Sequence, residues 1–135
     1  MADIAVATAG KIHIVGAPVQ QLTLPATEAI VAGAPVRIHT DGKWTNANGS
    51  SAGEARVWGI ATASVAAGAP LTAVRRGILD GFTFSQAYDA AIFLSDTDGR
   101  LADAAGTVST AIGRVVPGTA VTLGTAYDKL LSVEL

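Results

Sequence analysis

Glycine and proline interrupt this chain so often that a long helix has no room to form. The sequence holds 15 Gly and 5 Pro among 135 residues, and both residue types weaken or end helices. Between them β-branched residues predominate, with 13 Val, 9 Ile and 14 Thr against 10 Leu and 1 Met. The 27 Ala favour helix by propensity, but they show no 3.6-residue period. We therefore expect short strands joined by tight turns.

The apolar runs predict where these strands lie. Asp41-Gly42 predicts a hairpin turn between residues 35–40 and the returning residues 43–45. One helical turn is expected at residues 85–91, with Ser85 as its N-cap. The predicted strands are residues 11–15, 19–24, 35–40, 56–62, 71–76, 78–84, 92–94, 108–116, 120–123 and 129–135.

Length and pattern together predict one domain with an arm. Residues 1–10 are small and weakly patterned, which predicts an N-terminal arm that becomes ordered when a partner binds it. Residues 11–135 predict a single, mainly β domain, a small antiparallel barrel or sandwich with at most one short helix. A jelly roll stays open as an alternative, because short strands do not reveal their order.

The charge balance argues against nucleic-acid and membrane partners. The formal net charge is -2 and charged residues make up 15% of the chain, which leaves neither a basic stripe nor an acidic tail. No apolar run approaches the ~18 residues that cross a bilayer, and residues 1–6 lack the basic start of a secretory signal. With no Cys, disulfides and thiolate metal sites are excluded.

The residue types that carry catalysis form no convincing constellation. His13 and His39 each lie on a predicted strand, and no Ser sits in a nucleophile elbow that would complete a triad. The Asp-x-Asp-Gly motif at residues 96–99 resembles the start of a calcium loop, but Thr107 stands where the closing Glu belongs. We expect a plain turn there, no metal, no cofactor and no enzymatic activity.

Two tryptophans and a pair of arginines supply the candidate binding groups. Trp58 lies in a Val-Trp-Gly-Ile run and is expected in the core, whereas Trp44 follows a turn and fits either the core or an exposed anchor. Arg75 and Arg76 are the densest positive spot, yet strand neighbours point to opposite faces. An anion patch and an interfacial salt bridge are therefore equal alternatives. The arginines considered with this pair are Arg56 and Arg100.

The order of motifs in residues 30–135 carries a resemblance. Val-Trp-Gly-Ile-Ala-Thr-Ala at 57–63 is followed by a Gly-Ala-Pro turn and by Val-Arg-Arg-Gly-Ile-Leu-Asp-Gly at 74–81. Ile-Phe-Leu-Ser-Asp-Thr-Asp-Gly-Arg-Leu at 92–101 and Ala-Ile-Gly-Arg-Val-Val at 111–116 come next. This order resembles that of small tailed-bacteriophage head decoration (capsid cement) proteins and related virion β modules.

The resemblance implies a structural protein of the virion. Such a protein is made in the host cytoplasm, joins the capsid exterior as a trimer or dimer, and stabilises contacts between major capsid proteins, its partners. The N-terminal arm of such a protein reaches a neighbouring subunit, which makes residues of the arm candidates for capsid contact. The tryptophan and the arginine pair described above are further candidates. The candidate contact residues are Ala2, Asp3, Ile4, Ala5, Val6, Trp44, Arg75 and Arg76. The alternative is an exposed carbohydrate- or receptor-binding β module, since an aromatic such as Trp44 beside the polar loop 46–53 suits sugars.

Overall fold

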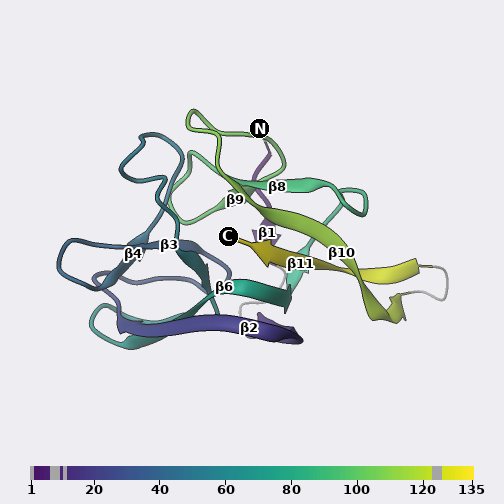
Figure 1. The fold of residues 1–135 in the computed structure, drawn as a ribbon, viewed down its shortest axis with the longest axis horizontal. Coiled ribbons are helices and arrows are strands. Elements are labelled where there is room, and N and C mark those ends of the chain that lie inside the picture. Colours follow the sequence, from purple (N-terminus) through teal and green to yellow (C-terminus); the bar gives the residue numbers. More distant parts are fainter. Residues whose placement is uncertain (1, 7–9, 11, 123–125) are drawn as a thin grey trace.

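The protein is mainly β, as the sequence predicts, and its principal sheet curls strongly into an antiparallel half-barrel (Figure 1). The computed structural model describes residues 2–6, 10, 12–122 and 126–135. The strands are β1 (Ala5–Val6), β2 (His13–Pro25), β3 (Pro35–Ile38), β4 (Trp44–Asn46), β5 (Gly59–Ala61), β6 (Pro70–Asp80), β7 (Phe82–Thr83), β8 (Ala91–Leu94), β9 (Leu101–Ala102), β10 (Ala111–Thr122) and β11 (Ala126–Glu134).

Strand β6 organises the sheet. Along one edge it pairs with the long strand β2, which runs along the lower edge of the fold in Figure 1. Along the other edge its first half pairs with β5 and its second half with β11. The sheet therefore continues in two directions from β6, through β5, β3 and β4 on one side and through β11, β10, β8 and β9 on the other.

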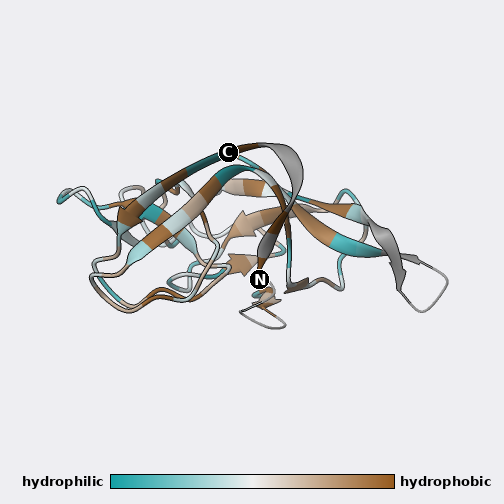
Figure 2. Cartoon of the chain, turned by 90° about the horizontal axis from the view of Figure 1, so that it is seen from below, coloured by the Kyte–Doolittle hydropathy of each residue, from teal (hydrophilic) through white to brown (hydrophobic). Residues whose placement is uncertain are grey.

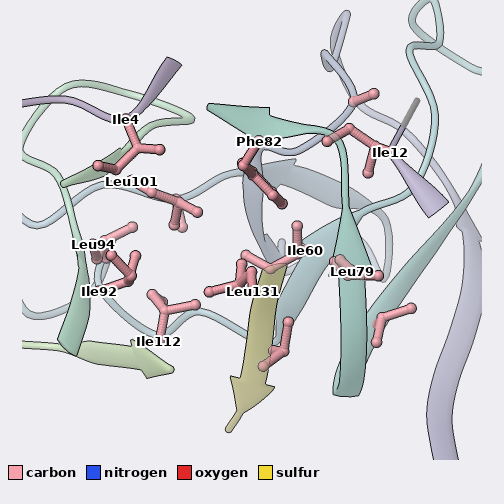
Figure 3. Close-up of a cluster of buried hydrophobic side chains, with 14 of the residues drawn as sticks. Ile4, Ile12, Ile60, Leu79, Phe82, Ile92, Leu94, Leu101, Ile112 and Leu131 are labelled. Atoms are coloured by element: carbon pink, nitrogen blue, oxygen red, sulfur yellow. The ribbon is translucent and has the colours of Figure 1, made fainter. Parts of the chain in front are cut away.

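Each half of the sheet covers its own core. The larger core gathers side chains from the β8–β11 side, and Figure 3 shows Ile92, Leu94, Ile112 and Leu131 among its members. The smaller core lies under β3 to β6, around the fully buried Trp44. Figure 2 shows hydrophobic segments on the strands that enclose these cores. Because strand side chains alternate between faces, neighbouring residues of the central strands enter different cores: Ile60 and Val74 lie in the larger core, and Ala61 and Ala73 lie in the smaller one.

The predicted hairpin at residues 35–46 is confirmed. β3 pairs with β4 in antiparallel register, from Val36 opposite Asn46 to Ile38 opposite Trp44. The turn is longer than two residues, because His39 N donates to the Lys43 carbonyl and Gly42 N donates back to His39. Gly42 has a φ of 82°, the left-handed conformation that closes a three-residue hairpin loop.

Two motif glycines permit close contact between strands. A Cβ at Gly113 would lie 1.8 Å from the Ser132 carbonyl oxygen, and one at Gly59 would lie 2.6 Å from the Val74 oxygen. Neither distance leaves room for a side chain. The Trp-Gly-Ile and Ile-Gly-Arg motifs therefore set how closely β5 approaches β6 and β10 approaches β11.

The helical turn predicted at residues 85–91 is wrong. This segment, all of it described, forms a bend and a turn with no helix. Asp89 takes a φ of 67° and its N–H donates to the Val115 carbonyl on β10. The hydrogen bond to β10 ties the segment to the sheet, and this tertiary contact outweighs the local preference for a helical turn.

Residues 2–6 lie along the chain's own sheet, where the sequence predicts a free arm. Asp3 bridges Ala102, and Ile4 N donates to the Leu101 carbonyl at 2.8 Å. Ala5 then pairs with Thr83 as β1 joins β7. The Ile4 side chain is 4% exposed and enters the larger core beside Leu101 (Figure 3). The segment is extended, but its contacts are internal.

Candidate binding site

The structure places both tryptophans at the smaller core, at different depths. Trp44 is fully buried, and its indole Nε1 donates to the Leu71 carbonyl at 2.8 Å. The interpretation of Trp44 as an exposed anchor is therefore wrong. Trp58, expected in the core, is half-buried and packs on the edge of the smaller core, with its ring 5.4 Å from that of Trp44. Its other side borders a surface hollow.

This hollow lies beside the β3, β5 and β6 strands and has a volume of about 850 Å³. It combines basic side chains with an apolar floor, and we call it the arginine hollow. Its lining residues are Arg37, Ile38, Thr40, Gly53, Glu54, Arg56, Val57, Trp58 and Arg75.

Strand register brings these residues together. Val36 on β3 pairs with Gly59, and Trp58 N donates to the Val36 carbonyl at 2.8 Å. Arg37 follows Val36, and Trp58 precedes Gly59. In an antiparallel pair, Arg37 and Trp58 are therefore opposite each other. Arg75 comes from β6 on the opposite side of β5, and its guanidinium lies 5.6 Å from the centre of the Trp58 ring. This is cation–π geometry.

The arginine hollow is rich in unpaired positive charge. Within the described part of the chain, none of Arg37, Arg56 and Arg75 forms an ion pair with a carboxylate. The Nε of Arg37 is buried and has no hydrogen-bond partner among the described residues. A buried donor without a partner costs free energy. The capacity of the site to bind an acceptor therefore rests on the three guanidinium groups that form no ion pair among the described residues.

The nearby carboxylates have other partners. Glu28 accepts hydrogen bonds from the hydroxyl of Thr45 and, at 3.0 Å, from Asn46 Nδ2. The Thr45 hydrogen bond is the main cause that lowers the pKa of Glu28, partly offset by burial, and Arg37 adds a smaller electrostatic contribution. Glu54, on the wall of the hollow, accepts from Ser50 Oγ at 3.2 Å.

The arginines considered from sequence separate into different surfaces. Arg75 and Arg56 line the hollow, whereas Arg76 is exposed and outside it, as the alternation of strand side chains predicts. Arg100 is exposed in the turn after β8 and takes no part. Arg37 was not among the candidate binding residues predicted from the sequence. The available signal was strand alternation, because Arg37 follows the inward-facing Val36 on β3 and is therefore expected to face outward.

The candidates in the N-terminal segment differ in their exposure. Ala2, Asp3 and Ala5 are exposed, Val6 is half-buried and Ile4 is buried. Asp3 Oδ1 accepts a hydrogen bond from Ser95 Oγ. Ile4 therefore contributes to the core. The side chains of this segment that a partner could contact are those of Ala2, Asp3, Ala5 and, in part, Val6.

The motifs weighed for chemistry lie elsewhere. His39 Nδ1 and Asp41 Oδ1 are 3.2 Å apart on the exposed β3–β4 turn. Desolvation raises the pKa of Asp41, but hydrogen bonds from Lys43 N–H and from His39 outweigh it and lower that pKa. The side chain of His13 lies outside the described residues.

The Asp-x-Asp-Gly motif at residues 96–99 forms a turn, as predicted. Asp96 accepts hydrogen bonds from Thr107 through its backbone N–H at 2.9 Å and its hydroxyl at 2.7 Å. Thr107 thus closes the loop by donating to Asp96. Among the described residues, no group of three or more His, Cys, Asp or Glu side chains is arranged to hold a metal ion.

No protein-family model, no curated protein and no solved structure matches this chain. Among the residues that the structure describes, no helix is long and apolar enough to cross a membrane.

Proposed function

We propose that the protein is a decoration protein of a bacteriophage head. It binds the outer surface of the shell as a trimer or dimer and stabilises contacts between major capsid proteins. It acts without a catalytic step or a cofactor, because shell stabilisation needs buried surface repeated over many copies. The proposal follows the resemblance in motif order, and a surface feature of the fold supports it.

That feature is the open edge of β2. The strand is 13 residues long and contains no Asp, Glu, Lys or Arg. It pairs with β6, and in the described part of the chain no strand pairs with its other edge. Val19 and Leu22 are exposed there. Natural proteins protect open edges with charges, because an open edge can pair with another chain. Pro18 and register shifts between Ile14 and Gln21 interrupt the strand, but its edge carries no charge. An uncharged edge of this length suits a protein that assembles with others.

The motifs behind the resemblance occupy structural positions. The Trp-Gly-Ile and Ile-Gly-Arg glycines lie where adjacent strands make their closest approach. The Ser-Asp-Thr-Asp-Gly turn follows β8 and packs on the loop after β4, through Gly49 N to the Ser95 carbonyl and Asn48 Nδ2 to Asp98. In this chain the motifs that carry the resemblance therefore set strand spacing and loop packing, which fits a structural role.

Co-sedimentation with assembled heads tests the proposal. Purified protein is mixed with heads that lack it, and the pelleted fraction is measured with and without heads. We expect saturable binding to heads and none to unassembled capsid protein.

Two variants test the role of the β2 edge. Leu22→Lys places a charge on that edge, and Val31→Lys is the control, since Val31 is an apolar residue that is 53% exposed elsewhere. We expect the first to reduce self-association in a sizing column and the second to leave it unchanged. Absence of saturable binding to heads would contradict the proposal.

A second candidate is the carbohydrate- or receptor-binding module. The burial of Trp44 removes its original support, since that ring has no exposed face. Among the residues that line the arginine hollow, the half-buried Trp58 is the aromatic side chain available for stacking on a sugar. A glycan array probed with the wild type and Trp58→Ala tests this candidate. Loss of glycan binding in the variant supports it, and an array without any hit counts against it.

A further inference from the structure

We propose that the arginine hollow binds an acidic segment of a partner protein, with carboxylate side chains on the guanidinium groups. The inference stands independently of whether the partner is a phage shell. It rests on the charge, the rigidity and the mixed lining of the hollow, which are taken in turn.

The positive charge of the hollow is concentrated, with three arginines against one lining carboxylate, Glu54. A chain with a formal net charge of -2 places three of its six arginines around one hollow. None of these three forms an ion pair among the described residues. Arg114, outside the hollow, shows the contrast, since it pairs with Asp89 and Glu134 at 2.8 Å each. Guanidinium groups bind carboxylates through paired N–H donors, so Arg37, Arg56 and Arg75 suit Asp or Glu side chains.

One of the basic groups, Arg75, is held in place before any ligand arrives. Arg75 lies over one face of Trp58, and Trp58 is packed at 5.4 Å against the buried Trp44. Trp44 is in turn anchored by its hydrogen bond to the Leu71 carbonyl. A chain of contacts therefore runs from the core to the Arg75 guanidinium. Fixing a side chain in advance lowers the entropic cost of binding.

The rest of the lining favours a peptide over a sugar. Ile38 is 43% exposed at the hollow, and Val57 and Trp58 are half-buried there. These surfaces suit apolar side chains that flank an acidic residue. A sugar presents many hydroxyl groups that need acceptors, and among the lining side chains the acceptors are Thr40 and Glu54. The lining thus offers many donors and few acceptors.

Fluorescence anisotropy with a defined probe tests the inference. The probe is a fluorescein-labelled peptide in which Glu and Leu alternate with Gly and Ser, and its control has Gln in place of each Glu. We expect the acidic peptide to bind the wild type and the Gln peptide to bind much more weakly. Arg56→Gln removes a loop residue of the hollow and should weaken binding about tenfold. Arg76→Gln removes the same charge from the next residue after Arg75, outside the hollow, and should change binding less than about twofold.

The variants also define the results that would overturn the inference. Equal binding of the Gln peptide, or an equal loss in Arg56→Gln and Arg76→Gln, shows general charge attraction and refutes a specific site. Arg75→Gln provides a second variant from a different strand, with folding of each variant checked by circular dichroism. Inorganic phosphate and oligogalacturonate are titrated in parallel. If either binds with the same dependence on Arg56 while the acidic peptide does not, the assignment to a peptide is wrong.

Discussion

Trp44→Ala is expected to destabilise the fold severely, because the side chain is fully buried and satisfies a backbone carbonyl. Replacing a buried tryptophan by alanine costs about 3–5 kcal/mol. The Leu71 carbonyl loses the indole N–H that donates to it at 2.8 Å, which adds about 1 kcal/mol. The total of about 4–6 kcal/mol is a large share of the ~5–15 kcal/mol that stabilises a typical domain.

A milder variant keeps this prediction measurable. Trp44→Phe retains an aromatic ring but removes the indole N–H and its hydrogen bond to the Leu71 carbonyl, and we expect the free energy of unfolding to fall by about 1–2 kcal/mol. Urea unfolding followed by far-ultraviolet circular dichroism measures the difference. At a slope of about 1.5 kcal/mol per molar urea, the midpoint should fall by about 1 M.

Trp58→Phe is the matched control, because Trp58 is half-buried and no hydrogen bond donated by its indole N–H is among those described. Its unfolding midpoint should fall by clearly less than that of Trp44→Phe. If Trp44→Ala costs less than about 1 kcal/mol, or if the Trp58 variant is the less stable of the two, the reasoning about the smaller core is refuted.

Three further changes test other parts of the structure. Gly113→Ala should prevent normal folding or cost more than about 3 kcal/mol, since the new Cβ would lie 1.8 Å from the Ser132 oxygen; urea unfolding measures it. Ile4→Ala should lower the free energy of unfolding by about 2–4 kcal/mol, since Ile4 packs in the core, and hydrogen exchange should show weaker protection at the amides of Ile4 and Asp103, which donate to the Leu101 and Ala2 carbonyls. Glu28→Gln should reduce the fall in the free energy of unfolding that the wild type shows as the pH is lowered. The pKa of Glu28 is lowered in the fold from its ordinary 4.5, so its stabilisation is present above that value and is lost as pH falls through the folded pKa.

Each of these three has a result that would contradict it. Gly68→Ala is the control for Gly113→Ala. Gly68 has a φ of 85°, but no atom lies within 4 Å of its new Cβ, so the free energy of unfolding should fall by about 1 kcal/mol. Equal losses at Gly68 and Gly113 would refute the close approach of β10 to β11. A harmless Ile4→Ala would show that the N-terminal segment does not contribute to the core. If Glu28→Gln and the wild type unfold at the same acid pH, the Glu28 carboxylate does not contribute the predicted pH-dependent stability.

The strand pattern was predictable where turn chemistry was explicit. Asp41-Gly42 between two alternating runs indicated the β3–β4 hairpin, because glycine accepts the positive φ that closes the loop. Residues 85–91 were mistaken for a helical turn, because the pattern of a Ser followed by small residues does not reveal the hydrogen bond from Asp89 N to Val115.

The candidate site was only partly predictable. Alternation correctly separates Arg75 from Arg76, but it does not reveal which of the two faces is covered by the core. The same limit explains why the sequence left Trp44 open between the core and the surface, and why it did not predict that Trp58 is only half-buried. Arg37 joins the hollow through the register of β3 with β5, and this long-range pairing has no local signal in the sequence.

The central claim is that this protein decorates the outside of a phage head. Cryo-electron microscopy of purified particles that carry the protein tests it most directly. We predict density for the half-barrel at repeated positions on the outer surface of the head, in contact with the major capsid protein and as a trimer or dimer. Particles that contain the protein but show no copies on the head surface would contradict the claim.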